Sequence, residues 1–216
     1  MKLIATFAFL AALLIISACG KKKPKPFCAD PCLKDTVKFI EESHPFQPYA
    51  YITAKDCRPD TLLWSYKGLG VNRKLDFTGL VKAEIQLDKA KIKAFIKDTS
   101  YIWLLFNDCS NGRGYFVKIP FDKKSDINRK GSALNSFDPK FNVAEGLVAY
   151  TDRGNIFVED MATGKKAMMT FGKTTDMDYD AIHETLDSVH ITSNRIWANV
   201  KMDYEWKIFE KNIKLE

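Results

Sequence analysis

Short apolar runs separated by turn sequences recur along much of the chain, most clearly in the segment 146–171. Three short apolar runs lie there, at 147–150, 156–160 and 167–171, and two turn sequences, Asp-Arg-Gly-Asn and Ala-Thr-Gly-Lys, separate them. Short apolar runs bounded by turn residues are typical of strands, and Gly, Asn and Asp favour turns. The pattern therefore predicts three antiparallel strands joined by tight turns.

Similar short runs, rich in aromatic and β-branched residues, predict more strands on both sides of this segment. They occupy 49–53, 61–66, 101–107, 115–121, 188–191, 195–198 and 206–208. Asn111-Gly112 lies between the third and fourth of these runs and is a strong hairpin signal. Looser strand–turn–strand units begin near Asp60, Thr99 and Asp187. We expect a mainly β fold of antiparallel meander units, because repeats of about 40 residues are typical of such architectures.

The residues just before 97 fit either a β-hairpin or a strand-like segment followed by a short helix. The residues at 81–87 and at 90–96 both alternate, with Asp88-Lys89 between them. We favour a hairpin across this dipeptide, although Ile92, Phe95 and Ile96 also have the spacing of a short helix.

One helix is predicted at the start of the folded part. Asp30-Pro31 suits an N-cap followed by a first helical position. The apolar residues that follow recur at i, i+4 and i+7: Leu33, Val37 and Ile40. Because this spacing is typical of one helix face, we expect a helix over 31–43 that ends before Pro45, with His44 in its solvated end.

The first 18 residues have the order of an export signal. Lys2 precedes an apolar run at 3–16, which is shorter than the roughly 18–20 residues that span a bilayer. The run ends in Ile16-Ser17-Ala18-Cys19, which resembles the bacterial lipobox, where a peptidase cuts before the cysteine and the thiol is lipidated. We therefore expect a signal peptide at 1–18 and a lipid anchor on Cys19; a plain secretory signal and an uncleaved anchor are the alternatives.

The segment 19–29 is predicted to be a solvated tether. It contains Lys-Lys-Lys-Pro-Lys-Pro, which cannot bury apolar surface. Its lysines would lie beside anionic headgroups. Gly20 follows the cysteine at the position where inner-membrane lipoproteins tend to have aspartate. Some bacterial groups use an acidic motif here to export lipoproteins to the cell surface, whereas this tether is basic. We expect an outer-membrane location with the folded part, residues 30–216, facing the periplasm as a single domain.

The segment 146–171 also resembles the repeat of TolB-like β-propellers. The similarity rests on Val-Ala-Tyr-Thr-Asp-Arg-Gly-Asn-Ile-Phe-Val-Glu-Asp-Met-Ala-Thr-Gly-Lys. The resemblance implies blades made of small antiparallel meanders and a face that binds proteins. Closed propellers usually have about 4–8 blades, so this chain suits a partial or small propeller-like arrangement, or another β-meander sandwich.

Net charge and cysteine content narrow the class of protein. The formal charge is +6, and four of the lysines lie in the tether, so the folded part is close to neutral and nucleic acid is not an expected partner.

Four cysteines besides Cys19 are present: Cys28, Cys32, Cys57 and Cys109. An even number in an exported chain predicts two disulfides. Three pairings are possible, including Cys28–Cys32 with Cys57–Cys109; a zinc site is disfavoured because Cys57 and Cys109 have no near cysteine.

An acidic segment at 174–190 is the main candidate for a metal site. Its carboxylates are spaced like positions 1, 3, 5, 9 and 12 of a calcium loop: Asp176, Asp178, Asp180, Glu184 and Asp187. Ala181 replaces the loop glycine, Asp187 is shorter than the usual glutamate, and His183 stands at a normally aliphatic position. A charged connection between strand units is the simpler interpretation. Calcium is the first alternative, and a hydrolytic or zinc site at His183, Glu184 and His190 is the second.

No familiar catalytic motif is present, so the leading hypothesis is a membrane-anchored, non-catalytic interaction module whose partners are envelope proteins. The competing enzyme hypothesis is a metal-assisted hydrolase that uses five residues of the acidic segment: Asp176, Asp178, Asp180, His183 and His190. A third hypothesis is a binder of glycans or small ligands, which needs at least two exposed tryptophans that share a groove. The four tryptophans lie in predicted strands, where core packing is the simpler role: Trp64, Trp103, Trp197 and Trp206.

Overall fold

The computed structural model describes residues 27–172 and 176–216. The predicted signal peptide at 1–18, the lipidation residue Cys19 and the tether up to residue 26 lie outside the described residues. Within the described ranges, no helix is long and apolar enough to cross a bilayer.

Strands dominate the fold and form four sheets of four strands each. Sheet A contains β1 (Val37–Ile40), β2 (Tyr49–Lys55), β3 (Arg58–Ser65) and β4 (Arg73–Asp76). Sheet B contains β5 (Ile92–Lys97), β6 (Tyr101–Asn107), β7 (Gly114–Pro120) and β8 (Asn128–Lys130). Sheet C contains β9 (Ala133–Leu134), β11 (Leu147–Asp152), β12 (Asn155–Asp160) and β13 (Lys166–Met169). Sheet D contains β10 (Phe141–Val143), β14 (Leu186–Ile191), β15 (Arg195–Met202) and β16 (Glu205–Asn212).

Most neighbouring strands are consecutive and antiparallel, as the meander pattern predicts. The exception is β10: after β9 the chain leaves sheet C, and β10 pairs in parallel with β14 of sheet D. The three strands predicted within 146–171 are confirmed as β11, β12 and β13. The helical segments of the described residues are short: α2 (Phe77–Val81), η2 (Lys89–Lys91) and η3 (Ile182–Glu184).

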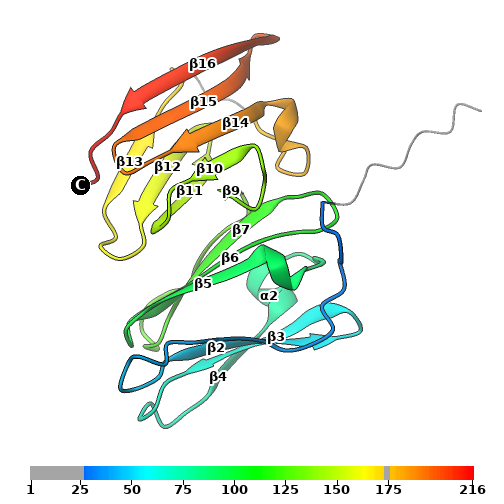
Figure 1. Cartoon of the computed structure of the whole chain (residues 1–216), viewed down its shortest axis with the longest axis vertical. Helices are drawn as coiled ribbons and strands as arrows, with labels where there is room; N and C mark the ends of the chain where they lie inside the picture. The colour runs from blue at the N-terminus through cyan, green and yellow to red at the C-terminus, as the bar shows by residue number, and fades with distance from the viewer. Residues whose placement is uncertain (1–26, 173–175) are drawn as a thin grey trace, which may run out of the picture.

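The four sheets lie in an open stack, with sheet A and sheet D at opposite ends (Figure 1). A large apolar core lies between sheets A and B, and a second lies between sheets C and D. A smaller core joins sheets B and C. The mainly β architecture of meander units is therefore confirmed, but the sheets do not close into a barrel or propeller.

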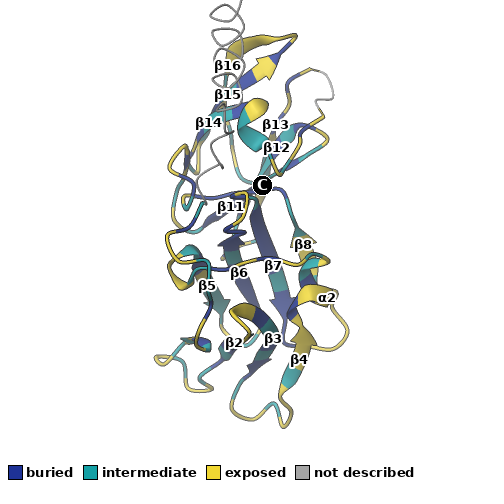
Figure 2. Cartoon of the chain, turned by 90° about the vertical axis from the view of Figure 1, so that its right-hand side faces the viewer, coloured by how far each residue is buried: buried dark blue, intermediate teal, exposed yellow. Residues whose placement is uncertain are grey.

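The central strands β6 and β7 are buried on both faces, which Figure 2 shows as dark blue ribbons. Ile102 and Leu104 contribute to the core against sheet A, whereas Trp103 and Phe116 contribute to the core against sheet C. A strand covered on both faces needs apolar residues at successive positions rather than strict alternation. This explains the nearly continuous apolar run at 101–107.

The helix predicted over 31–43 is wrong. Residues 29–36 contain neither helix nor strand, and the segment continues as β1, where Val37 pairs with Ile52. Leu33 and Val37 are buried as expected, but their spacing of four is even and so fits one face of an extended chain as well as of a helix. The third residue of the pattern, Ile40, is 42% exposed.

The hairpin predicted across Asp88-Lys89 is also wrong, because 81–87 forms no strand. Asp76 caps α2 by accepting from the Gly79 backbone N at 2.6 Å, and the chain then runs irregularly to η2. Ile85 and Leu87 alternate because both side chains enter the core between sheets A and B. The predicted strand in the second half is present as β5, and it pairs with β6.

The prediction of two disulfides is confirmed, and the pairs are Cys28–Cys109 and Cys32–Cys57. Neither is the short Cys28–Cys32 loop. The backbone N of Leu33 also donates to the Cys57 carbonyl at 3.2 Å. The two bridges attach the first described residues to sheets A and B, which holds this segment extended.

Candidate binding cleft between sheets B and C

The acidic segment does not gather its carboxylates around one point. Asp180 accepts from Arg113 Nη1 at 3.1 Å and from Asn111 Nδ2 at 3.0 Å. Asp187 accepts from Lys140 Nζ at 2.6 Å, and this hydrogen bond is the main cause of the lowered pKa of Asp187. The other three carboxyl residues are exposed: Asp176, Asp178 and Glu184. In the described part of the chain, no three His, Cys, Asp or Glu residues are grouped so as to hold a metal ion.

The two histidines of the hydrolase hypothesis have separate partners. His183 Nε2 lies 2.8 Å from Oδ2 of the buried Asp138, and this hydrogen bond raises the pKa of His183 against the opposing effect of burial. His190 lies on β14, where its Nδ1 is 3.0 Å from Asn142 Nδ2. Sequence reasoning missed the His183–Asp138 pair because the two residues are 45 positions apart.

The tryptophans divide between core and surface. Trp64 and Trp103 are buried as predicted, with exposed fractions of 5% and 0%. Trp197 is half-buried and Trp206 is 46% exposed. Trp206 pairs with Lys201, four residues from Trp197 along β15, so both rings lie on the outer face of sheet D. Neither lines any of the four hollows found in the described residues, so those hollows do not provide the groove that a glycan binder needs.

The largest of these hollows is a cleft of about 390 Å³ between sheets B and C, called here the B–C cleft. It is lined on one side by Lys93, Ala94, Phe95 and Leu105, and on the other by residues 134–137, residues 143–147 and Met161. These segments come from both halves of the molecule and are distant in sequence. No pattern in the sequence indicated them, because only the stacking of the sheets brings them together.

The B–C cleft exists because sheet C covers sheet B incompletely. Trp103 and Phe116 are buried against Met161 and the first strands of sheet C. Gly114 allows β7 to approach β9 closely, since a Cβ there would lie 2.1 Å from the Ala133 carbonyl oxygen. After the two-residue strand β9 the chain runs irregularly past the start of β5, where Lys91 Nζ donates to the Phe137 carbonyl at 3.1 Å, and Phe95 is only half-buried.

Polar groups lie among the apolar walls of the B–C cleft. Asn135 is 4% exposed, and its Nδ2 has no hydrogen-bond acceptor among the described residues. Its Oδ1 accepts from the Phe137 backbone N at 3.2 Å, which fixes the amide. Lys93 is exposed, with its Nζ 5.6 Å from the centre of the Phe137 ring. The Nδ2 atom is itself buried and lies beside Gly114 of β7, whereas the exposed Lys93 ammonium is a donor that a ligand in the cleft can reach.

An ionic bridge joins the same two sheets. Glu159 on β12 has a side chain only 4% exposed, and its carboxylate lies 3.3 Å from Lys118 Nζ and 3.1 Å from Lys166 Nζ. Lys118 belongs to β7, and its Nζ is 4.3 Å from the centre of the Tyr101 ring and 4.8 Å from that of Trp103. The bridge therefore links sheets B and C beside the buried ring of Trp103.

No protein-family model matches the chain, and neither a curated protein nor a solved structure is significantly similar to it. The lipobox and the TolB-like repeat therefore stay predictions from the sequence.

Proposed function

We propose that this protein is a lipid-anchored, non-catalytic binding protein of the bacterial envelope, held at the outer membrane with its folded part in the periplasm. The lipobox at Ile16-Ser17-Ala18-Cys19 and the basic tether support the anchorage. The B–C cleft carries the binding role. Envelope proteins are the partners that such a module would meet.

The ligand proposed for the B–C cleft is a small amphipathic molecule. A volume of about 390 Å³ lies within the range of roughly 300–1,000 Å³ that is usual for small-molecule sites. Phe95, Leu105 and Leu147 offer apolar contact, whereas the exposed Lys93 ammonium offers a donor to a polar or anionic group. Apolar walls with a few placed polar atoms are typical of such sites.

The test is the binding of an amphipathic anionic dye, anilinonaphthalene sulfonate, followed by fluorescence. Leu105→Trp introduces a larger side chain into the cleft, and we expect it to weaken dye binding about tenfold or more, equivalent to about 1.4 kcal/mol. Lys93→Gln removes the cation near the anionic group and should weaken binding by a smaller factor.

The matched control is Leu75→Trp on the edge strand β4, where the original leucine is 37% exposed and outside the cleft. It should leave the dye affinity unchanged. Equal affinities of Leu105→Trp and Leu75→Trp, with both proteins folded by circular dichroism, would contradict the proposed site.

A further inference from the structure

A second hollow, of about 320 Å³, has a different chemical character. Four of its ten lining residues are basic and none is acidic: Lys82, Arg113, Arg129 and Lys130. We call it the basic pocket. Tyr115 and Val117 of β7 contribute to its lining. A hollow with one sign of charge concentrates the field and attracts counter-ions, so the chemistry of the basic pocket favours an anion.

Backbone contacts hold the two arginines of the basic pocket. Arg113 Nε donates to the Gly131 carbonyl at 2.7 Å, and its guanidinium lies 5.5 Å from the centre of the Tyr115 ring. Arg129 Nη1 donates to the Leu80 carbonyl at 3.3 Å. Carbonyl contacts orient an arginine without neutralising it, and a planar guanidinium fork matches the oxygens of a phosphate group.

Two of the four charges are partly balanced. Arg113 pairs with Asp180 at 3.1 Å, and Lys130 pairs with Asp152 at 3.1 Å. Lys82 and Arg129 have no carboxylate partner among the described residues, and both are exposed. The basic pocket therefore keeps an excess of positive charge that is accessible from solvent.

The basic pocket lies at the tethered end of the molecule. The Phe27 ring covers Gly112, the residue before Arg113, so closely that a Cβ on Gly112 would lie 2.8 Å from it. The Phe27 backbone N donates to the Cys109 carbonyl at 3.1 Å, and Cys28 is bonded to Cys109. Figure 1 shows the described chain beginning beside the turn between β6 and β7.

This position limits the distance to the bilayer. Phe27 lies eight positions after Cys19, and an extended chain of eight residue steps spans at most about 26–29 Å. We propose that the basic pocket binds the phosphate group of an anionic phospholipid headgroup, which orients the anchored protein with this end toward the membrane. The inference rests on the anchorage in the proposed function but not on the B–C cleft.

The test uses the intact lipidated protein in vesicles, with lysine labelling by a membrane-impermeant amine reagent read out by peptide mass spectrometry. Flotation first establishes whether the protein is anchored. Lys82 labelling is then compared in vesicles of phosphatidylcholine alone and in vesicles that also contain phosphatidylglycerol. A bound headgroup slows labelling by 1 + [L]/Kd, about tenfold when the lipid is at about ten times Kd.

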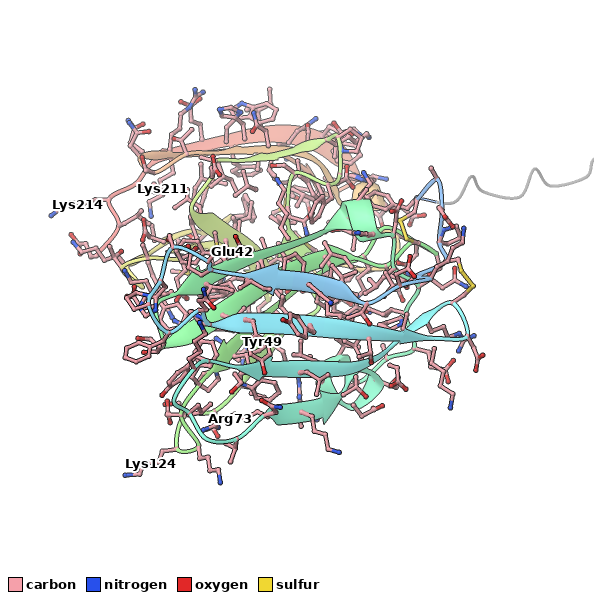
Figure 3. The ribbon with its side chains drawn as sticks, turned by 60° about the horizontal axis from the view of Figure 1, so that its bottom comes forward. Glu42, Tyr49, Arg73, Lys124, Lys211 and Lys214 are labelled. Carbon is pink, nitrogen blue, oxygen red and sulfur yellow. A yellow bond between two sulfur atoms is a disulfide. The ribbon has the colours of Figure 1, made fainter. Side chains whose placement is uncertain are left out.

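Reference lysines and matched variants separate a pocket from general attraction. Figure 3 shows Lys124 and Lys214 on the side of the molecule opposite the disulfides, so their labelling should not change with the lipid. Arg129→Gln should abolish most of the protection of Lys82. Lys124→Gln removes the same charge elsewhere and should preserve that protection.

Four results would contradict the assignment, and each has a different meaning. Equal slowing at Lys82, Lys124 and Lys214 would indicate only surface potential. Protection of Lys82 by inorganic phosphate in phosphatidylcholine vesicles would indicate a site for soluble phosphate rather than lipid. Failure to float would refute the anchorage itself, whereas flotation without protection of Lys82 would refute the basic pocket alone.

Discussion

The buried carboxylate of Glu159 gives the most quantitative prediction about the contact between sheets B and C. Lys118→Met keeps the length of the side chain and its contact with Tyr101 and Trp103 but removes the charge that lies 3.3 Å from Glu159. Breaking a fully buried ion pair costs about 3–5 kcal/mol, because it leaves a charge unpaired. Lys166 remains 3.1 Å from the carboxylate, so we expect a loss of about 2–3 kcal/mol in the free energy of unfolding.

A second ion pair between the same sheets provides the control. Lys130 Nζ on β8 lies 3.1 Å from Asp152 on β11, and it also lies 5.0 Å from the centre of an aromatic ring, that of Tyr150. The Asp152 side chain is 49% exposed, compared with 4% for Glu159. Lys130→Met should therefore cost less than about 1 kcal/mol, because solvent screens an exposed pair and stabilises the remaining carboxylate.

Urea unfolding at constant pH, followed by circular dichroism, measures both variants. In thermal unfolding, a loss of about 2–3 kcal/mol corresponds to a fall in Tm of about 4–12 °C for a domain of this size. The double variant Lys118→Met with Glu159→Leu should be more stable than Lys118→Met alone, because it no longer buries an unpaired charge. Equal costs for Lys118→Met and Lys130→Met would refute the argument that burial of the carboxylate determines the effect.

Three further predictions concern a histidine, a disulfide and the anchor. The partner Asp138 raises the pKa of His183, so the stabilisation from this pair is fully present below pH 6.5 and is lost as the pH rises through the folded pKa. Measured by urea unfolding between about pH 6 and about pH 9, the free energy of unfolding should fall more steeply for wild type than for His183→Gln, and parallel curves would contradict this prediction. Replacement of Cys28 and Cys109 by alanine opens a loop with a sequence separation of 81 and should lower the free energy of unfolding by about 4.5 kcal/mol, measured by chemical unfolding. A loss under about 1 kcal/mol would mean that this bridge does not constrain the unfolded chain. Cys19→Ser should abolish fatty-acid labelling and membrane association, and continued incorporation of labelled fatty acid would show that another residue is modified.

The sequence predicted the strands where short apolar runs and turn chemistry agreed. The segment 146–171 has both signals and forms β11, β12 and β13. The hairpin around Asn111-Gly112 is present for the same reason, with Asn107 opposite Gly114 at its end. Such local signals do not depend on the rest of the chain.

The errors occurred where a tertiary contact determines the local structure. Leu33 and Val37 have a helical spacing, but the bond between Cys32 and Cys57 holds the segment extended. Ile85 and Leu87 alternate like strand residues, yet their side chains enter the core without a pairing strand. Disulfide pairing and core position depend on the whole fold, so a local pattern does not reveal them.

Neither the B–C cleft nor the basic pocket had a signal in the sequence. Phe95 and Met161, or Arg113 and Arg129, meet only when the sheets stack and the edge strand β8 pairs with β7. Sequence reasoning instead singled out the acidic segment, because its regular spacing is local. In the structure Asp180 pairs with a basic side chain from another part of the chain, Arg113.

The most direct test of the proposed function is native mass spectrometry of the lipidated protein, extracted from its own membranes in mild detergent. We predict that wild type and Leu75→Trp carry a noncovalent ligand mass in addition to the covalent lipid on Cys19. Leu105→Trp should retain the covalent lipid and lose the noncovalent ligand, because the larger side chain occupies the B–C cleft. The same ligand load on Leu105→Trp and wild type, or a wild-type protein with covalent lipid and no bound ligand, would contradict a binding role for the B–C cleft.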